Sequence, residues 1–123
     1  MTNIIIRINN NDYLATLNKT DTAQSILSSL PIKGRIKRWG EEIYFSIPLV
    51  IDECPDAKTE VEVGDLAYWP PGQAFCVFFG STPYSQADKP VAASPVNVFG
   101  SLLELPSQLF DIKDNAQVEI CLA

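Results

Sequence analysis

The segment that most restricts the fold runs from residue 64 to 83 and reads GDLAYWPPGQAFCVFFGSTP. Two apolar runs, DLAYW and AFCVFFG, flank the sequence Pro-Pro-Gly. Pro71 followed by Gly72 suits the central positions of a tight turn, because proline fixes φ and glycine accepts a positive φ. Side chains alternate along a strand, which divides the second run into two faces: Phe75, Val77 and Phe79 on one, Cys76 and Phe78 on the other. The segment therefore predicts a hairpin that is apolar on both faces, as in the core of a small β protein.

The sequence before this segment predicts two further hairpins and one helix. The β-branched run NIIIRI and the alternating run YLATL flank four turn-forming residues, Asn-Asn-Asn-Asp at 9–12. GRIKRW and EEIYFSI, within residues 34–47, also alternate, with a turn at Trp39-Gly40 or Gly40-Glu41 between them. Between these hairpins, Thr20 or Asp21 can cap a short amphipathic helix over TAQSILSSL, which Pro31 ends.

The later sequence predicts a long loop among short strands. Residues 81–96, STPYSQADKPVAASPV, contain three prolines and no period, and a structureless loop of this length usually forms a lid or a binding surface. We expect strands at 58–63 and 96–105, one helical turn at 105–110 and a closing strand at 117–122. Many short strands, one or two short helices and Gly/Pro turns indicate a single mostly β domain over residues 1–123, a barrel or a sandwich.

Charge and hydropathy disfavour two classes of partner. The net charge is −6 and basic residues cluster only in GRIKR at 34–38, whereas nucleic-acid affinity depends on neutralising phosphates. No apolar run approaches the roughly 20 residues that cross a bilayer. The N-terminal sequence MTNIIIRINN also lacks the parts of a signal peptide. We therefore predict a cytoplasmic protein with no nucleic-acid or membrane partner.

The chain has no histidine and three widely spaced cysteines. The absence of histidine removes Ser-His-Asp and Cys-His nucleophilic sites, histidine-ligated metals and the commonest general base at neutral pH. The cysteines form no C-x-x-C pair, and we expect Cys76 to be a buried small apolar side chain. Glu41 and Glu42 are adjacent on a strand, so they cannot act as a carboxylate pair, and we expect both in a solvated hairpin turn. We predict no metal site and no cofactor.

Four segments, WGEEIYF, GDLAYWPPG, FFGSTP and VFG, resemble a group of small bacterial and archaeal proteins described as cyclophilin-like, over nearly the whole chain. Residues 64–104 also resemble the cyclophilins, which are peptidyl-prolyl isomerases, in the order of four short segments. This resemblance implies a mostly β fold, a closed cyclophilin-like β-barrel with one or two short helices and a cleft.

The same resemblance implies positions for a site. Cyclophilins supply a glutamine and a phenylalanine to their proline pocket from a segment similar to Gln73-Ala-Phe75. Their Thr-Pro-Trp resembles Thr82-Pro83-Tyr84, their site histidine would fall on Val96, and their catalytic arginine on Arg35, which Arg38 could replace. We expect a cleft lined by Trp69, Gln73, Phe75 and Tyr84.

Three functions follow from these residues. The leading hypothesis is a barrel that binds a peptide or small apolar ligand in a shallow cleft, without efficient catalysis. The first alternative is a prolyl isomerase in which Arg35 holds the amide, although a solvated strand position is the commoner place for such an arginine. The second alternative is a structural or assembly protein that uses the cleft and the loop 81–96 as an interface. The sequence leaves the oligomeric state open.

Overall fold

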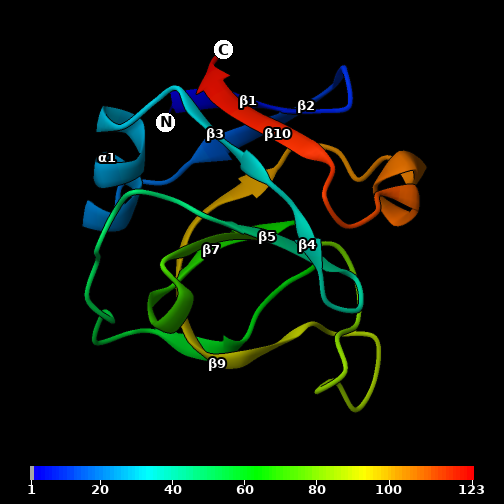
Figure 1. The fold of residues 1–123 in the computed structure, drawn as a ribbon. Helices are drawn as coiled ribbons and strands as arrows, with labels where there is room; N and C mark the ends of the chain where they lie inside the picture. Colours follow the sequence, from blue (N-terminus) through cyan, green and yellow to red (C-terminus); the bar gives the residue numbers. More distant parts are fainter. Residues whose placement is uncertain (1) are drawn as a thin grey trace.

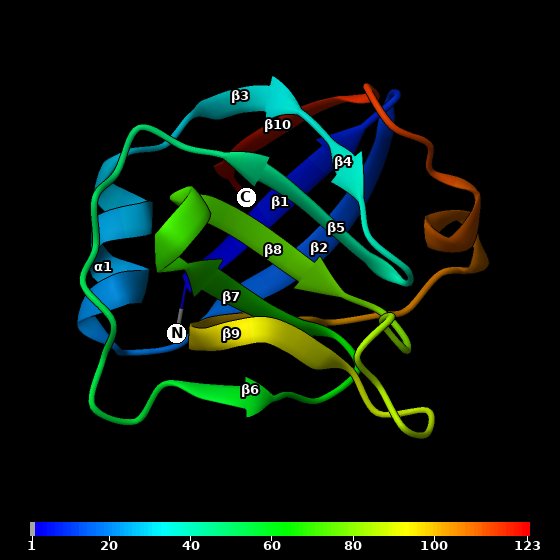
Figure 2. The ribbon, with the colours of Figure 1, turned by 60° about the horizontal axis from the view of Figure 1, so that its bottom comes forward.

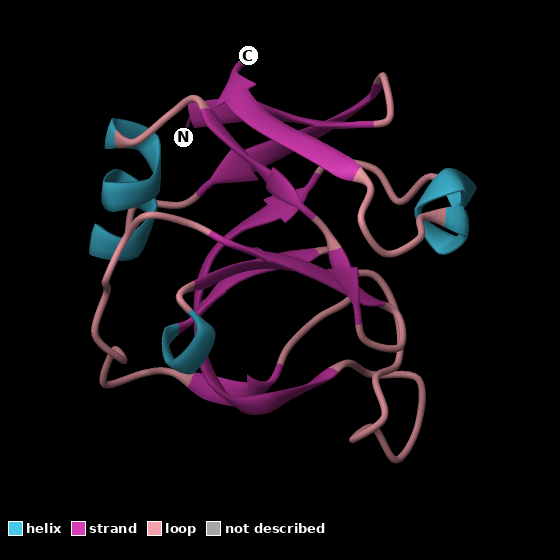
Figure 3. Cartoon of the chain, in the orientation of Figure 1, coloured by secondary structure: helices cyan, strands magenta, loops and turns pink. Residues whose placement is uncertain are grey.

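Hairpins account for most of the chain in the computed structural model, which describes residues 2–123 (Figures 1 and 3). The strands are β1 (Thr2–Ile8), β2 (Asn11–Leu17), β3 (Ile32–Arg35), β4 (Lys37–Arg38), β5 (Glu42–Ser46), β6 (Lys58–Glu60), β7 (Asp65–Trp69), β8 (Ala74–Phe78), β9 (Val91–Leu102) and β10 (Gln117–Leu122). Helix α1 (Asp21–Ser28) and the 3-10 helices η1 (Pro70–Gly72) and η2 (Ser107–Asp111) complete the fold. None of the helices within residues 2–123 is long and apolar enough to cross a membrane.

The two N-terminal hairpins and the helix are confirmed where the sequence predicts them. Asn9 and Asn10, at φ 50° and 70°, form the two-residue turn between β1 and β2, a conformation that asparagine tolerates. Gly40, at φ 62°, provides the turn between β4 and β5. The Thr20 side chain caps α1 by accepting a hydrogen bond from the backbone N–H of Ala23 at 3.2 Å.

The hairpin β7–β8 is also confirmed, but its turn differs from the prediction. Pro70, Pro71 and Gly72 form η1, and Gln73, not Gly72, takes the positive φ of 48°. Glycine is nevertheless required at position 72, because a Cβ there would lie 2.7 Å from two ring carbons of Trp69. The turn therefore brings the chain directly against the indole ring of Trp69.

The strands pair antiparallel in the order β3-β10-β1-β2-β9-β7-β8-β5-β4, and β6 pairs with β9 outside this path (Figure 2). The mostly β class is thus confirmed, whereas hydrogen bonding does not close the sheet into the predicted barrel. The two ends of the sheet, β3 and β4, are consecutive strands separated only by Ile36. Consecutive strands that continue in one direction cannot pair with each other. Each pairs on one side only, β3 with β10 and β4 with β5. The two edges of the sheet are therefore joined by the covalent chain at Ile36 and not by hydrogen bonds between strands.

The loop predicted at 81–96 is shorter than expected. β9 begins at Val91, and its pairing with β6 has an irregular register between Val91 and Val96. Pro95, which has no N–H to donate, lies in this irregular stretch. Of the three prolines in the predicted loop only Pro95 lies within β9, and the strand therefore begins before the predicted start at residue 96. β6 ends at Glu60 rather than at residue 63.

Two apolar clusters flank β8, as the alternation of its side chains predicts. Phe75, Val77 and the following Phe79 belong to the main core, which is enclosed by the sheet and α1. Ala74, Cys76 and Phe78 belong to a second, smaller cluster on the opposite face. This second cluster also contains Val61, Ala67, Ala92 and Val96, with Tyr44, Trp69 and Val98 packed against it. Cys76 is buried, as predicted.

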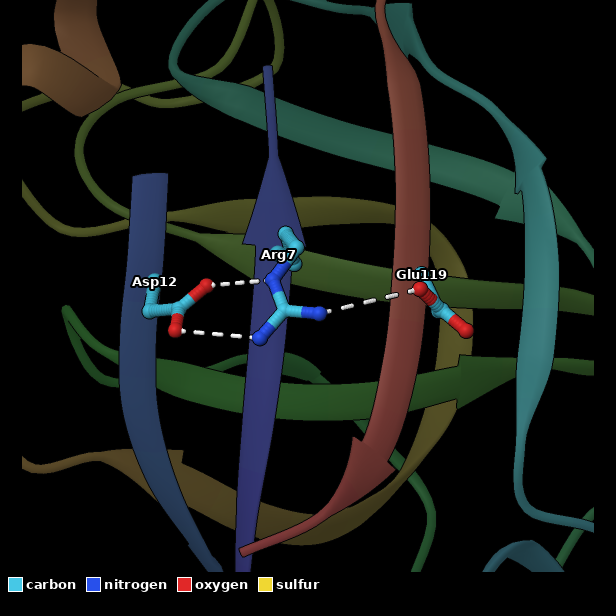
Figure 4. Close-up of polar contacts among 3 residues, drawn as sticks. All are labelled: Arg7, Asp12 and Glu119. Atoms are coloured by element: carbon cyan, nitrogen blue, oxygen red, sulfur yellow. Dashed lines mark hydrogen bonds and ion pairs between the residues drawn. The ribbon is translucent and has the colours of Figure 1, made fainter. Parts of the chain in front are cut away.

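On the outer surface, Arg7 links three neighbouring strands (Figure 4). Its Nε lies 2.7 Å from Asp12 Oδ1 on β2, and its Nη1 lies 3.9 Å from Glu119 Oε1 on β10. The hydrogen bond from Arg7 lowers the pKa of Asp12. Because these side chains are solvent-exposed, the pairs contribute little to stability.

Candidate functional site

A hollow of about 180 Å³, called the aromatic pocket here, opens beside the second apolar cluster. It is lined by Trp39, Glu42, Tyr44, Trp69, Tyr84, Ala92, Ala93 and Val96. Neighbouring strands supply most of this lining, since β5 pairs with β8, β8 with β7 and β7 with β9 (Figure 2). The pocket thus occupies the face of the sheet that points away from the main core.

Trp39 and Tyr84 form one wall, although they lie 45 positions apart in the chain. Their rings meet edge to face, with centroids 5.0 Å apart and an interplanar angle of 82°. The loop that carries Tyr84 is held against the β4–β5 turn, because the N–H of Glu41 donates to the carbonyl of Ser81 at 2.8 Å. Gly40 allows this close approach, since a Cβ there would lie 2.8 Å from Pro83 Cδ.

Trp69 and Tyr44 form the opposite side. The indole Nε1–H of Trp69 donates to Ser94 Oγ on β9 at 2.7 Å, and Gly72 lies directly against the ring. Tyr44 pairs across the strands with Cys76 and packs against the second cluster. The Trp69 ring is therefore held by a hydrogen bond and by Gly72, and the Tyr44 ring by packing.

Glu42 provides the one ionisable carboxyl group among the pocket-lining residues within 2–123. The residue is only 6% exposed, and no lysine or arginine in that range forms an ion pair with it. Burial raises the pKa of Glu42 to about 7, and the neighbouring Cys76 thiol opposes this shift. Burial, together with the charge of Glu42, raises the pKa of Cys76 well above its usual range, so the thiol stays protonated.

The prediction that both glutamates lie in a solvated turn is wrong for Glu42. Glu41 points to the other face, where its Oε1 accepts a hydrogen bond from the N–H of Ser81 at 3.2 Å. Glu42 lies opposite Phe78 and shares the pocket face with Tyr44. The sequence EEIYF could have predicted a buried glutamate. If this strand pairs with AFCVF, one of the two glutamates must face the apolar side chains of β8.

The structure brings together two of the four residues predicted for the cleft. Trp69 and Tyr84 line the pocket, whereas Phe75 is 0% exposed in the main core, packed against Phe45 and Phe99. Gln73 is exposed at the η1 turn and does not line the pocket. The sequence reasoning did not select the remaining polar and aromatic lining residues, Trp39, Glu42 and Tyr44.

Arg35 lies outside the aromatic pocket. It is exposed, its Nη1 donates to the carbonyl of Asn115 at 3.0 Å, and it lines a neighbouring groove that shares Tyr44 and Trp69 with the pocket. Arg38 donates to the carbonyls of Gly40, Phe110 and Ile112 at 2.7–3.0 Å. Its guanidinium also lies 5.3 Å from the centroid of the Phe79 ring. Because Phe110 and Ile112 lie in and directly after η2, Arg38 attaches the η2 segment to the sheet.

The chemistry of the pocket follows from this lining. Within residues 2–123 no three His, Cys, Asp or Glu side chains gather as ligands for a metal ion. Within the same range, no cation lines the pocket to polarise an amide carbonyl. The arrangement offers aromatic surface, one buried carboxyl group and the hydroxyls of two tyrosines.

Comparison with known proteins supports the fold. The family model described as Cyclophilin-like matches residues 2–121. The solution structure of the hypothetical protein AF2241 from Archaeoglobus fulgidus has a TM-score of 0.83 and 37% identity, covering 99% of this chain and 95% of that one. The structure of McbB in complex with tryptophan has a TM-score of 0.66 at 14% identity, covering 97% of this chain and 44% of that one, a likeness of fold alone. No curated protein matches this chain.

Proposed function

Since this chain belongs to the cyclophilin-like family, we propose that it is a binding module that takes a small apolar ligand, or one side chain of a peptide, in the aromatic pocket. The observation that carries this proposal is the convergence of four aromatic side chains, from the β4–β5 hairpin, β7 and the loop after β8, around a space that none of them fills. Tyrosine and tryptophan offer a large rigid surface at a low entropic cost on binding. The hollow is smaller than the 300–1,000 Å³ typical of drug-sized ligands, which favours a ligand of few atoms.

Catalysis of prolyl isomerisation is not part of this proposal. That reaction needs a cation that can reach the amide of the bound proline, and Arg35 lines the adjacent groove while Arg38 is occupied by three carbonyls. The assembly role of the loop 81–96 stays a prediction.

The two tryptophans of the chain make the test direct, because both line the pocket. We would follow their indole N–H resonances by NMR while adding cyclohexanol, 3,3-dimethyl-1-butanol, tryptophan and a panel of X-Pro tetrapeptides. Tryptophan is included because McbB was solved with it. Saturable shifts of both resonances are expected with at least one of these compounds.

Tyr84→Ala should weaken that binding about tenfold, as loss of a pocket wall does at binding hot spots. Phe110→Ala is the matched control, because Phe110 is also exposed but packs against Phe79 rather than the pocket. Absence of any saturable shift would contradict the proposal. Accelerated peptide isomerisation that Arg35→Ala abolishes would instead support the isomerase alternative.

A further inference from the structure

A pocket that binds only neutral apolar ligands does not need a buried carboxyl group such as that of Glu42. Glu42 lines the pocket beside four aromatic side chains, the residue is only 6% exposed, and it has no cationic partner within residues 2–123. A buried carboxylate without a partner is costly, and a cation that enters the pocket would remove that cost.

The aromatic walls favour the same sign of charge. Tryptophan and tyrosine attract cations over their faces, and cages of aromatic rings are a recurrent way to recognise quaternary ammonium groups. A metal ion is a poorer occupant, because it needs several oxygen, nitrogen or sulfur ligands and Glu42 supplies the one carboxylate in the lining. The net charge of −6 also raises the local concentration of cations around the molecule.

We propose that the aromatic pocket selects small organic ammonium ions, with the positive group paired to the Glu42 carboxylate and its alkyl groups against Trp39, Tyr44 and Trp69. This inference rests on the proposed function, because it names the chemical class of ligand for the same pocket. It adds a role for Glu42 that a site for neutral apolar ligands does not need.

The selection depends on pH near neutrality. Cation binding requires the ionised carboxylate, whereas burial favours its protonated form. The Cys76 thiol on β8 is the titratable group that interacts with Glu42, and Tyr44 and Tyr84 also line the pocket. On the neighbouring β4, Lys37 pairs across the strands with Tyr44 and lines the adjacent groove. β7 and β9 contribute Trp69, Ala92, Ala93 and Val96, none of which titrates. Affinity for a permanent cation should therefore increase as the pH is raised from 6 to 8.

The test compares choline with 3,3-dimethyl-1-butanol, in which carbon replaces the charged nitrogen in an otherwise similar shape. Titrations followed at the two indole N–H resonances should show choline binding at least about tenfold more tightly than the alcohol at pH 8. Choline affinity should fall about tenfold between pH 8 and pH 6, while that of the alcohol should not change. Choline carries a permanent charge, so the titration of the ligand does not contribute.

Glu42→Gln should abolish the preference for choline and its pH dependence, and leave the alcohol affinity within about twofold. Glu104→Gln is the matched control, because Glu104 is exposed and lies outside the pocket lining, so the same change there should alter neither. Equal binding of choline and the alcohol by the wild-type protein would overturn the inference while the proposed function stood. Failure of every tested compound to shift the resonances would overturn both.

Discussion

At the scale of single residues, Glu42 lies where its neighbours would suit an apolar side chain. It pairs across the strands with Phe78 and faces the same cluster as Cys76. Burial raises its pKa from the ordinary value of 4.5 to about 7, so the folded chain binds this proton more tightly than the unfolded chain does. The folded state is therefore favoured by protonation, and this part of its stability is lost as the pH rises from about 4.5 through about 7.

Glu42→Gln removes this dependence by replacing the carboxyl group with a neutral group of similar shape. At pH 8 the variant should be more stable than the wild type by on the order of 3 kcal/mol, and at pH 5 the difference should be much smaller. Urea unfolding at the two pH values measures this, with Glu104→Gln, at an exposed position, as the control. If the difference in unfolding free energy between the wild type and Glu42→Gln is the same at both pH values, the pKa of Glu42 is not raised in the folded state.

Gly72 controls the position of Trp69. A methyl group at this position would lie 2.7 Å from the six-membered ring of the indole, so Gly72→Ala should displace the ring and break its hydrogen bond to Ser94. We expect a large shift of the Trp69 indole N–H resonance and at least about tenfold weaker ligand binding. Ser94→Ala removes the hydrogen bond without moving the ring, and should therefore shift the resonance but retain most of the binding.

At the scale of elements, Arg38 attaches η2 to the edge of the sheet. Its guanidinium donates to the carbonyls of Phe110 and Ile112, which lie within and directly after η2, and it also lies over the Phe79 ring. Arg35, three residues earlier at the end of β3, donates to the single carbonyl of Asn115. The two arginines of GRIKR therefore differ in structural importance despite their similar sequence setting.

Arg38→Ala should destabilise the fold by about 2 kcal/mol and increase amide hydrogen exchange at Leu109 and Ile112, because charged donors contribute more than neutral ones. Arg38→Lys should rescue little of this, since an ammonium group cannot reproduce the planar fork of donors. Arg35→Ala is the control and should change stability by less than about 1 kcal/mol. Equal effects of the two alanine substitutions would show that η2 is held by other contacts.

The predictions from sequence succeeded for elements defined by neighbouring residues. The turn at Asn9-Asn10, the cap at Thr20 and the two faces of β8 all follow from local conformation or from alternation. The errors arise where distant segments decide the outcome. β9 begins before Pro95 because β6 pairs with it irregularly, and Glu42 is buried because β8 lies beside β5. The same limit applies to the site, where Trp39 and Tyr84 meet only through the packing of a loop on a turn.

At the scale of the whole molecule, the aromatic pocket and the main core share β8, so they should not unfold separately. Phe75 and Val77 contribute to the core, while Ala74 and Cys76 contribute to the cluster beside the pocket. We expect the urea transition followed by tryptophan fluorescence, which reports the pocket, to coincide with that followed by far-ultraviolet circular dichroism, which reports the sheet. A fluorescence transition at lower urea concentration would show that the pocket side opens independently.

The division of β8 between two clusters also has a consequence for protein engineering. Because alternate side chains face different surroundings, Ala74, Cys76 and Phe78 can be varied as one set while Phe75, Val77 and Phe79 are kept as another. A library restricted to the first set would alter the support of the pocket without removing a side chain from the main core. The strand thus offers a route to new ligand preferences on an unchanged scaffold, by natural divergence or by design.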